Sequence, residues 1–104
     1  MFFCLFVLLF SEAPSKIENL KATPSCKSIK LKWERPKQDG GMPINKYVLT
    51  YSSTTLNIDG DETSYIITDL EHNTEYSISL RATSKAKWGP PVHVNVKTEE
   101  YCEI

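Results

Sequence analysis

The sequence predicts an all-β fold of two packed sheets, and three observations support this prediction. Apolar and polar residues alternate with a period of two in several short runs, as in SIKLKWE, where Ile29, Leu31 and Trp33 share one face. Turn-forming residues separate these runs at short intervals, which is typical of a sandwich. After residue 10, no apolar period of 3.6 residues continues beyond two helical turns, so we expect no substantial helix.

Seven strands account for the whole domain. We expect them at residues 14–23, 27–34, 46–53, 55–58, 62–68, 76–84 and 92–96. In the first strand, Ile17 and Leu20 both belong inside, and their odd spacing predicts the kink or bulge common in edge strands. Between the fourth and fifth strands, Asp59 and Gly60 have the chemistry of a tight two-residue hairpin turn.

The inward positions of these strands predict the core. Trp33 is its expected centre, since it is the largest side chain on an inward parity. The other predicted core residues follow the same alternation or close the corner after the fifth strand. The full predicted core is Trp33, Tyr47, Leu49, Tyr65, Ile67, Leu70, Tyr76, Ile78 and Leu80. The opposite parity is expected to leave only Lys, Thr, Ser and His outside.

The segment DLEHNTEY, from Asp69 to Tyr76, is the most specific feature of the chain. A leucine, a polar corner and a tyrosine six residues after the leucine suit a sandwich where the chain passes between sheets. The tyrosine ring packs inward while its hydroxyl bonds back to the backbone of the corner. We therefore predict such a corner between Leu70 and Tyr76.

With this corner, the run around Trp33 and the run INKYVLTY, the chain resembles a fibronectin type III domain over residues 14–98. The resemblance implies a seven-stranded, two-sheet Greek-key sandwich of immunoglobulin-like type. It also implies that Trp33 packs between the sheets, against inward side chains of the third and sixth strands. Residues 1–13 are then an apolar leader, and residues 99–104 form a C-terminal tail.

The first ten residues, MFFCLFVLLF, are apolar throughout. They are too few to cross a bilayer, which takes ~20 residues, but they fit the hydrophobic region of a secretory signal peptide. Ser11 and Ala13 would be the small residues before cleavage. No basic residue precedes the run and Pro14 would follow the cut, so an unprocessed apolar segment is the alternative.

The resemblance gives the cysteines a structural role. Cys4 lies in the leader and would be removed with it, which leaves Cys26 and Cys102. In the family's topology the first and last strands end at the same pole, so the resemblance places these cysteines near each other. A bridge there would stabilise the fold by ~3–5 kcal/mol in the chain-entropy model. Two unrelated thiols are the alternative.

Composition and motifs argue against several functions. The chain of 104 residues has a formal net charge of -1 and a sequence pI near 6.1, so nothing favours nucleic acid or a membrane surface as partner. His72 and His93 lie at different strand ends without a catalytic motif or a metal-ligand spacing. The run from Asp59 to Glu62 lacks the length of a calcium loop. We expect no enzyme, metal or cofactor.

Two loops remain as candidate contact surfaces. The stretch RPKQDGGMPINKY resembles a loop of immunoglobulin-superfamily adhesion proteins, such as neural cell adhesion molecules, and of titin-like proteins. In the family's topology it shares a pole with the loop after residue 84. The candidate partner contacts on these loops are Lys85, Lys87, Trp88, Asp39 and Gly40. The alternative is structural: Trp88 would cover the start of the last strand, and the glycines of the first loop would serve only its shape. A weaker candidate for heparin-like binding is a basic stripe of Lys27, Lys30 and Lys32.

The sequence therefore predicts a non-catalytic protein–protein interaction and spacer module. Its expected setting is a cell-adhesion or receptor-type protein, secreted or on the outer face of the cell, because disulfides persist in oxidising compartments. The alternative is an intracellular structural module of a titin-like filament protein. The partner is unknown, the mature domain has no stable membrane span, and the isolated module is expected to be a monomer.

Overall fold

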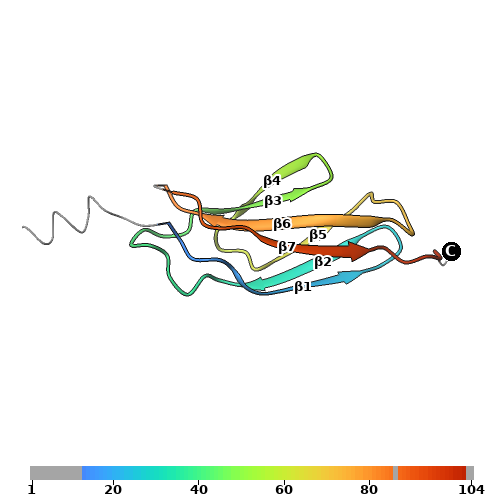
Figure 1. Cartoon of the computed structure of the whole chain (residues 1–104), viewed down its shortest axis with the longest axis horizontal. Coiled ribbons are helices and arrows are strands. Elements are labelled where there is room, and N and C mark those ends of the chain that lie inside the picture. Colours follow the sequence, from blue (N-terminus) through green and yellow to red (C-terminus); the bar gives the residue numbers. More distant parts are fainter. Residues whose placement is uncertain (1–12, 86, 103–104) are drawn as a thin grey trace, which may run out of the picture.

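The computed structural model describes residues 13–85 and 87–102, which form seven strands in two sheets. The strands are β1 (Glu18–Pro24), β2 (Ile29–Glu34), β3 (Lys46–Tyr51), β4 (Thr54–Asp59), β5 (Ser64–Ile67), β6 (Glu75–Thr83) and β7 (Val92–Lys97). One sheet has the order β1-β2-β5 and the other β4-β3-β6-β7, with every neighbouring pair antiparallel. Figure 1 shows the two layers lying along the same long axis. The predicted all-β sandwich is confirmed.

The first strand contains the predicted irregularity. The pairing of β1 with β2 shifts register between Glu18 and Lys21, and Asn19 inside that interval has a positive φ of 51°. This extra residue lets Ile17 before the bulge and Leu20 within it both face the core. The described residues contain no helix long and apolar enough to cross a bilayer. The predicted leader lies outside the described residues.

The core is built from the inward parity of both sheets. Tyr47, Leu49, Ile67, Leu70, Ile78 and Leu80 are buried around Trp33, while Tyr65 and Tyr76 are partly buried against the same cluster. The Trp33 ring meets the Tyr47 ring of β3 edge to face, which joins the two sheets at their centre.

The corner before β6 has the geometry expected from DLEHNTEY. The backbone N–H of Glu71 donates a hydrogen bond to the Tyr76 hydroxyl at 2.9 Å. Asp69 and Asn73 adopt positive φ angles of 60° and 51°, which asparagine and aspartate tolerate better than most residues. The Leu70 N–H donates to the carbonyl of Lys27 at 3.0 Å, and this bond ties the corner to the start of β2.

The prediction of a hairpin at Asp59 and Gly60 is wrong. The strands on either side of this turn, β4 and β5, belong to different sheets and do not pair. The turn is real: the Glu62 N–H donates to the Asp59 carbonyl at 3.0 Å, and the Asp61 N–H donates to Asp59 Oδ1 at 3.0 Å. It carries the chain from one sheet to the other. Gly60 is buried, and a Cβ there would collide with the carbonyl oxygen of Ile44.

The outer surface is less polar than predicted. Ile66, Trp88 and Tyr101 are exposed, with 53%, 56% and 81% of their surface accessible. Ile66 lies on β5 between the inward residues Tyr65 and Ile67, so alternation itself places it outside. An apolar residue on the outward parity was therefore visible in the sequence run SYII.

Candidate protein-interaction surface

The loop after β2, residues 35–45, is held in a defined shape. Gly40 and Gly41 have positive φ angles of 77° and 94°, and the Gly41 N–H donates to Asp39 Oδ1 at 2.9 Å. The Ser15 N–H donates to the Gln38 carbonyl at 2.9 Å, so the segment before β1 braces the loop. A hollow of about 330 Å³ lies against it, lined by Arg35, Lys37 and Asp39 among others. The loop is thus a shaped surface.

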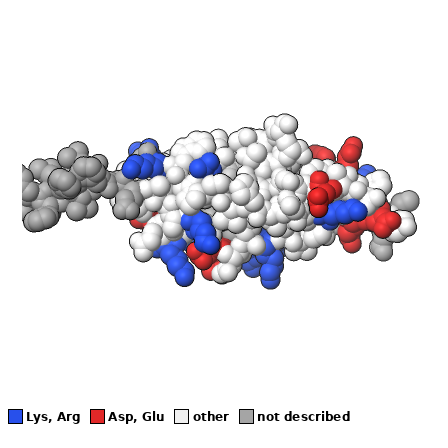
Figure 2. Space-filling view, viewed as in Figure 1, with Lys and Arg blue, Asp and Glu red and all other residues white. Residues whose placement is uncertain are grey.

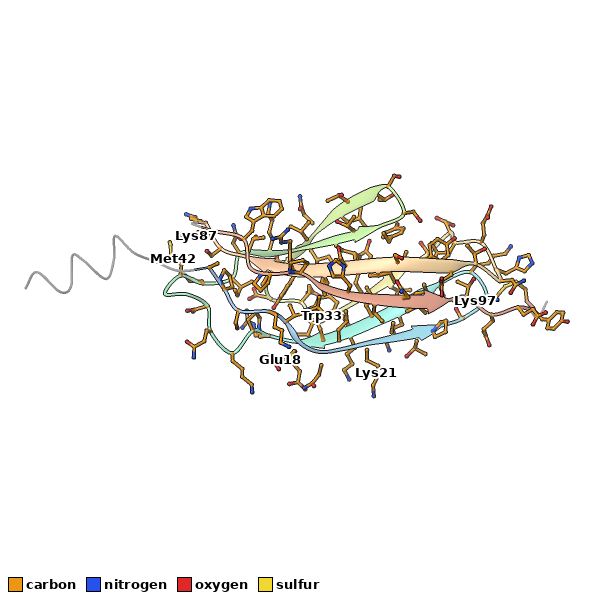
Figure 3. The ribbon with its side chains drawn as sticks, viewed as in Figure 1. Glu18, Lys21, Trp33, Met42, Lys87 and Lys97 are labelled. Carbon is orange, nitrogen blue, oxygen red and sulfur yellow. A yellow bond between two sulfur atoms is a disulfide. The ribbon has the colours of Figure 1, made fainter. Side chains whose placement is uncertain are left out.

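The loop between β6 and β7 lies at the same end of the molecule, as its described residues 84–85 and 87–91 show in Figure 1. Figure 3 shows Met42 of the first loop and Lys87 of the second together at that end, with Lys97 at the other. The Asn45 N–H donates to the Thr83 carbonyl at 2.9 Å, and the Thr83 hydroxyl donates to Asn45 Oδ1 at 3.0 Å. These bonds connect the bases of the two loops. We call this end the loop pole, defined by residues 35–45, 84–85 and 87–91.

Trp88 is presented outward on a fixed backbone. The backbone of Trp88 forms an isolated antiparallel β-bridge with Thr83. The Arg81 guanidinium carbon lies 5.1 Å from the centroid of the Trp88 ring. The Arg81 Nε–H donates to the Gly89 carbonyl at 2.9 Å, which orients that guanidinium. Gly89 packs directly against the backbone of Pro14: a Cβ at this position would lie 2.6 Å from the Pro14 carbonyl oxygen. The neighbours Lys85 and Lys87 are exposed.

The opposite end carries the disulfide, and we call it the cysteine pole, defined by residues 24–28, 68–75 and 98–102. Cys26 and Cys102 are joined across 76 residues of sequence, with their Cα atoms 5.1 Å apart. Because β7 ends at Lys97, the following residues can cross the pole: the Glu99 N–H donates to the Ser25 carbonyl at 3.0 Å. The buried Thr98 hydroxyl donates to the Glu71 carbonyl at 2.6 Å. The segment expected as a tail is therefore tied to the body through Cys102.

Sequence comparison agrees with this architecture. The family profile of the fibronectin type III domain matches residues 12–95. The chain belongs to the fibronectin type III family. A titin homolog of Caenorhabditis elegans is 28% identical to this chain over 80 residues. The match covers 70% of this chain and, to the nearest per cent, 0% of that far longer protein. Chicken (Gallus gallus) tenascin is 33% identical over 86 residues, which are 78% of this chain and 4% of that protein.

A solved structure supports the same family. A segment of two fibronectin type III domains from chicken tenascin superposes with a TM-score of 0.71 at 28% identity, covering 80% of this chain and 49% of that one. Fibronectin type III domains are non-enzymatic structural modules, and they occur in extracellular proteins such as tenascin and in intracellular ones such as titin. The chain thus corresponds to one module of much longer relatives.

The basic stripe predicted on the second strand is rearranged in this fibronectin type III module. Lys30 and Lys32 are exposed on the outer face of β2, and Lys21 of β1 stands directly opposite Lys32. Lys27 lies before β2 instead, where it borders a hollow with Asp69 and Glu71 at the cysteine pole. Sequence alternation missed Lys21 because the pairing of two strands, not one strand alone, brings it beside Lys32. Figure 2 shows basic atoms along the edge formed by β1 and β2.

The histidines lie apart in the structure. His72 is exposed at the corner before β6, and His93 is exposed on β7. Among residues 13–85 and 87–102, no three His, Cys, Asp or Glu side chains gather into a set able to hold a metal ion.

Proposed function

We propose that this chain is a non-catalytic protein–protein interaction and spacer module of an extracellular adhesion or receptor-type protein. The observation that carries the proposal is the disulfide between Cys26 and Cys102. Disulfides form and persist in oxidising compartments, whereas cytosolic thiols are kept reduced. The bridge joins the end of the first strand to the segment after the last, so it fastens the C-terminal segment to the body of the domain.

The loop pole is the surface that we propose for partner binding. Tryptophan is enriched among the residues that dominate binding energy at interfaces, and Trp88 offers an exposed ring already oriented by Arg81. Asp39 and Gly40 on the neighbouring loop have their backbone fixed by the turn at Gly41. A surface fixed before binding loses less conformational entropy when a partner docks.

An intracellular spacer is the second candidate. The similarity to the titin homolog supports it, since that protein is a relative of comparable identity to tenascin. The two candidates differ in one chemical property, the redox state of Cys26 and Cys102. In a reducing cytosol the two thiols would be free.

Expression of the whole chain in eukaryotic secretory cells tests the proposal. We expect protein in the medium that lacks residues 1–13 and yields a peptide pair linked through Cys26 and Cys102 in non-reducing mass spectrometry. Protein retained in the cytosol with Met1 intact and both thiols free would overturn the extracellular proposal and favour the filament-type spacer.

A further inference from the structure

The strand β4 is an outer strand of the sheet β4-β3-β6-β7 and pairs with β3 along its whole length without a shift of register. Gly60, directly after β4, donates its N–H to the carbonyl of Asn45, directly before β3, at 3.2 Å. Backbone groups alternate in direction along an antiparallel strand. Counting back from Gly60, the backbone groups of Thr55, Asn57 and Asp59 therefore point away from β3.

The outward backbone groups of β4 are largely unpaired. The turn after the strand satisfies one of them, since the Glu62 N–H donates to the Asp59 carbonyl at 3.0 Å. Within residues 13–85 and 87–102, the outward groups of Thr55 and Asn57 have no hydrogen-bond partner. Figure 1 shows β4 at the margin of the molecule, with no strand beyond it. A row of free N–H and C=O groups is recognised by the extended backbone of another chain.

The other outer strands have features that hinder such pairing. The strand β1 contains the irregularity at Asn19 and also Lys21 and Pro24, β5 has four residues, and β7 lies close to β1 of the other sheet. Bulges, Lys, Pro, shortness and cover are the usual protections of an edge strand. The sequence of β4, TTLNID, contains no Lys or Pro, and its one charged residue is Asp59 at the end. Among the described strands, β4 is thus the edge open to pairing.

We propose that β4 pairs antiparallel with β4 of a second copy of the chain, about a two-fold axis at Asn57. Antiparallel pairing of two identical strands has a two-fold axis by construction, so the contact is complementary to itself and closes after two copies. The four-stranded sheet of one copy then continues into that of the other through the two β4 strands. The inference concerns backbone groups and does not depend on the cellular compartment.

The alternation of backbone groups selects the register. With Asn57 opposite Asn57 of the second copy, Thr55 lies opposite Asp59, and every outward residue of β4 faces another outward residue. On the inner face of the sheet, the half-buried Leu56 meets Ile58 of the other copy, which places apolar beside apolar. The two Asp59 carboxylates do not lie opposite one another. Like charges directly opposite are destabilising in such pairs, so this register avoids a penalty.

The association is weak. One strand of each copy takes part, so the contact falls below the ~1,200 Å² of total buried surface found in stable complexes. The monomer expected from the sequence is therefore the state at low concentration. The dimer forms where copies are crowded together.

Amide hydrogen exchange of the whole oxidised chain, followed by NMR from micromolar to millimolar concentration, tests the proposal. We expect the amides of Thr55 and Asn57 to exchange severalfold more slowly as the concentration rises. The amides of Leu56 and Ile58 are the matched internal control, because they point toward β3 and should be protected at every concentration. Exchange of Thr55 and Asn57 that does not depend on concentration would overturn the proposal, as would protection that appears only when a different protein is added.

A charge exchange at the axis gives a second, independent test. Asn57→Lys and Asn57→Asp should each abolish self-association in sedimentation velocity, because residue 57 faces its own copy. An equal mixture of the two variants should associate again, since each mixed pair brings opposite charges together. Asn57→Thr is the matched control: it keeps the backbone N–H, adds no charge and should associate like the wild type. A mixture that stays monomeric, or an Asn57→Lys variant that associates like the wild type, would contradict the proposal.

Discussion

The ring of Tyr47 lies edge-on to the ring of Trp33, with centroids 5.4 Å apart and planes inclined by 67°. Both side chains are buried, yet neither the Tyr47 hydroxyl nor the Trp33 Nε1 has a hydrogen-bond partner among the described residues. The contact that joins the two sheets is therefore stabilised by apolar burial and ring geometry, and the two polar atoms oppose it.

Tyr47→Phe should consequently raise the free energy of unfolding, by about 1 kcal/mol, because it removes a buried hydroxyl without a protein partner. Urea unfolding followed by fluorescence measures the change. Tyr76→Phe is the matched control: it deprives the Glu71 N–H of its acceptor and should lower the free energy of unfolding by about 1 kcal/mol. If Tyr47→Phe destabilises the protein as much as Tyr76→Phe does, the Tyr47 hydroxyl has a partner.

Trp33→Ala should lower the free energy of unfolding by ~3–5 kcal/mol, since it leaves a large cavity between the sheets. Equilibrium denaturation measures this change. Circular dichroism is the suitable signal, because the substitution removes a tryptophan and so alters the fluorescence. A change in the free energy of unfolding below ~1 kcal/mol would contradict the central position of Trp33, because effects that small are typical of substitutions at the surface.

The strands were predictable because alternation with a period of two is a local property of the sequence. The corner was predictable for a similar reason, since Leu70 and Tyr76 are linked by a short segment with one favourable geometry. The Greek-key connection of the strands then followed from the resemblance to a family, which supplied the topology that local patterns lack.

The errors concern relationships between strands. Asp59 and Gly60 have the chemistry of a hairpin, but turn chemistry does not determine whether the flanking strands pair, and here they enter different sheets. Glycine is needed at position 60 for another reason: the carbonyl of Ile44 lies where a Cβ would be. Likewise, the register of β1 on β2 brings Lys21 beside Lys32, which neither strand reveals alone.

The triple substitution of Lys85, Lys87 and Trp88 by alanine should weaken partner binding while changing the free energy of unfolding by less than ~1 kcal/mol, as surface substitutions usually do. Binding of fluorescent, multivalent protein to cells that display a partner measures the first effect. Alanine at Lys30 and Lys32 is the matched control on the sheet face. Loss of binding in this control but not in the triple variant would move the contact to that face, and unfolding of the triple variant would make Trp88 a structural residue.

Reduction of the disulfide should lower the melting temperature without changing the strand content, because the core around Trp33 does not include Cys26 or Cys102. The chain-entropy estimate for a loop of this size is about 4.5 kcal/mol. Thermal denaturation with and without reductant, followed by far-ultraviolet circular dichroism, measures the shift. The variant Cys26→Ser should melt like the reduced protein in both conditions. Equal melting temperatures for the oxidised and reduced wild type would contradict the bridge.

The same bridge should limit how far the module extends under tension. When force acts between Pro14 and Cys102, the disulfide closes residues 26–102 into a loop that carries no load, so unfolding lengthens only the segment before Cys26. Reduction releases the 76 residues of that loop, which adds about 250–270 Å of contour length at ~3.3–3.6 Å per residue.

Single-molecule stretching with attachment points before residue 14 and after residue 102 measures this difference. Cys26→Ser should give the long extension whether or not reductant is present. Equal extension of the oxidised and reduced wild type would show that the bridge does not close this loop. A short oxidised extension would give the proposed spacer a specific mechanical property: it would keep a nearly constant length even after its sandwich has unfolded, because the load would pass directly from Cys26 to Cys102.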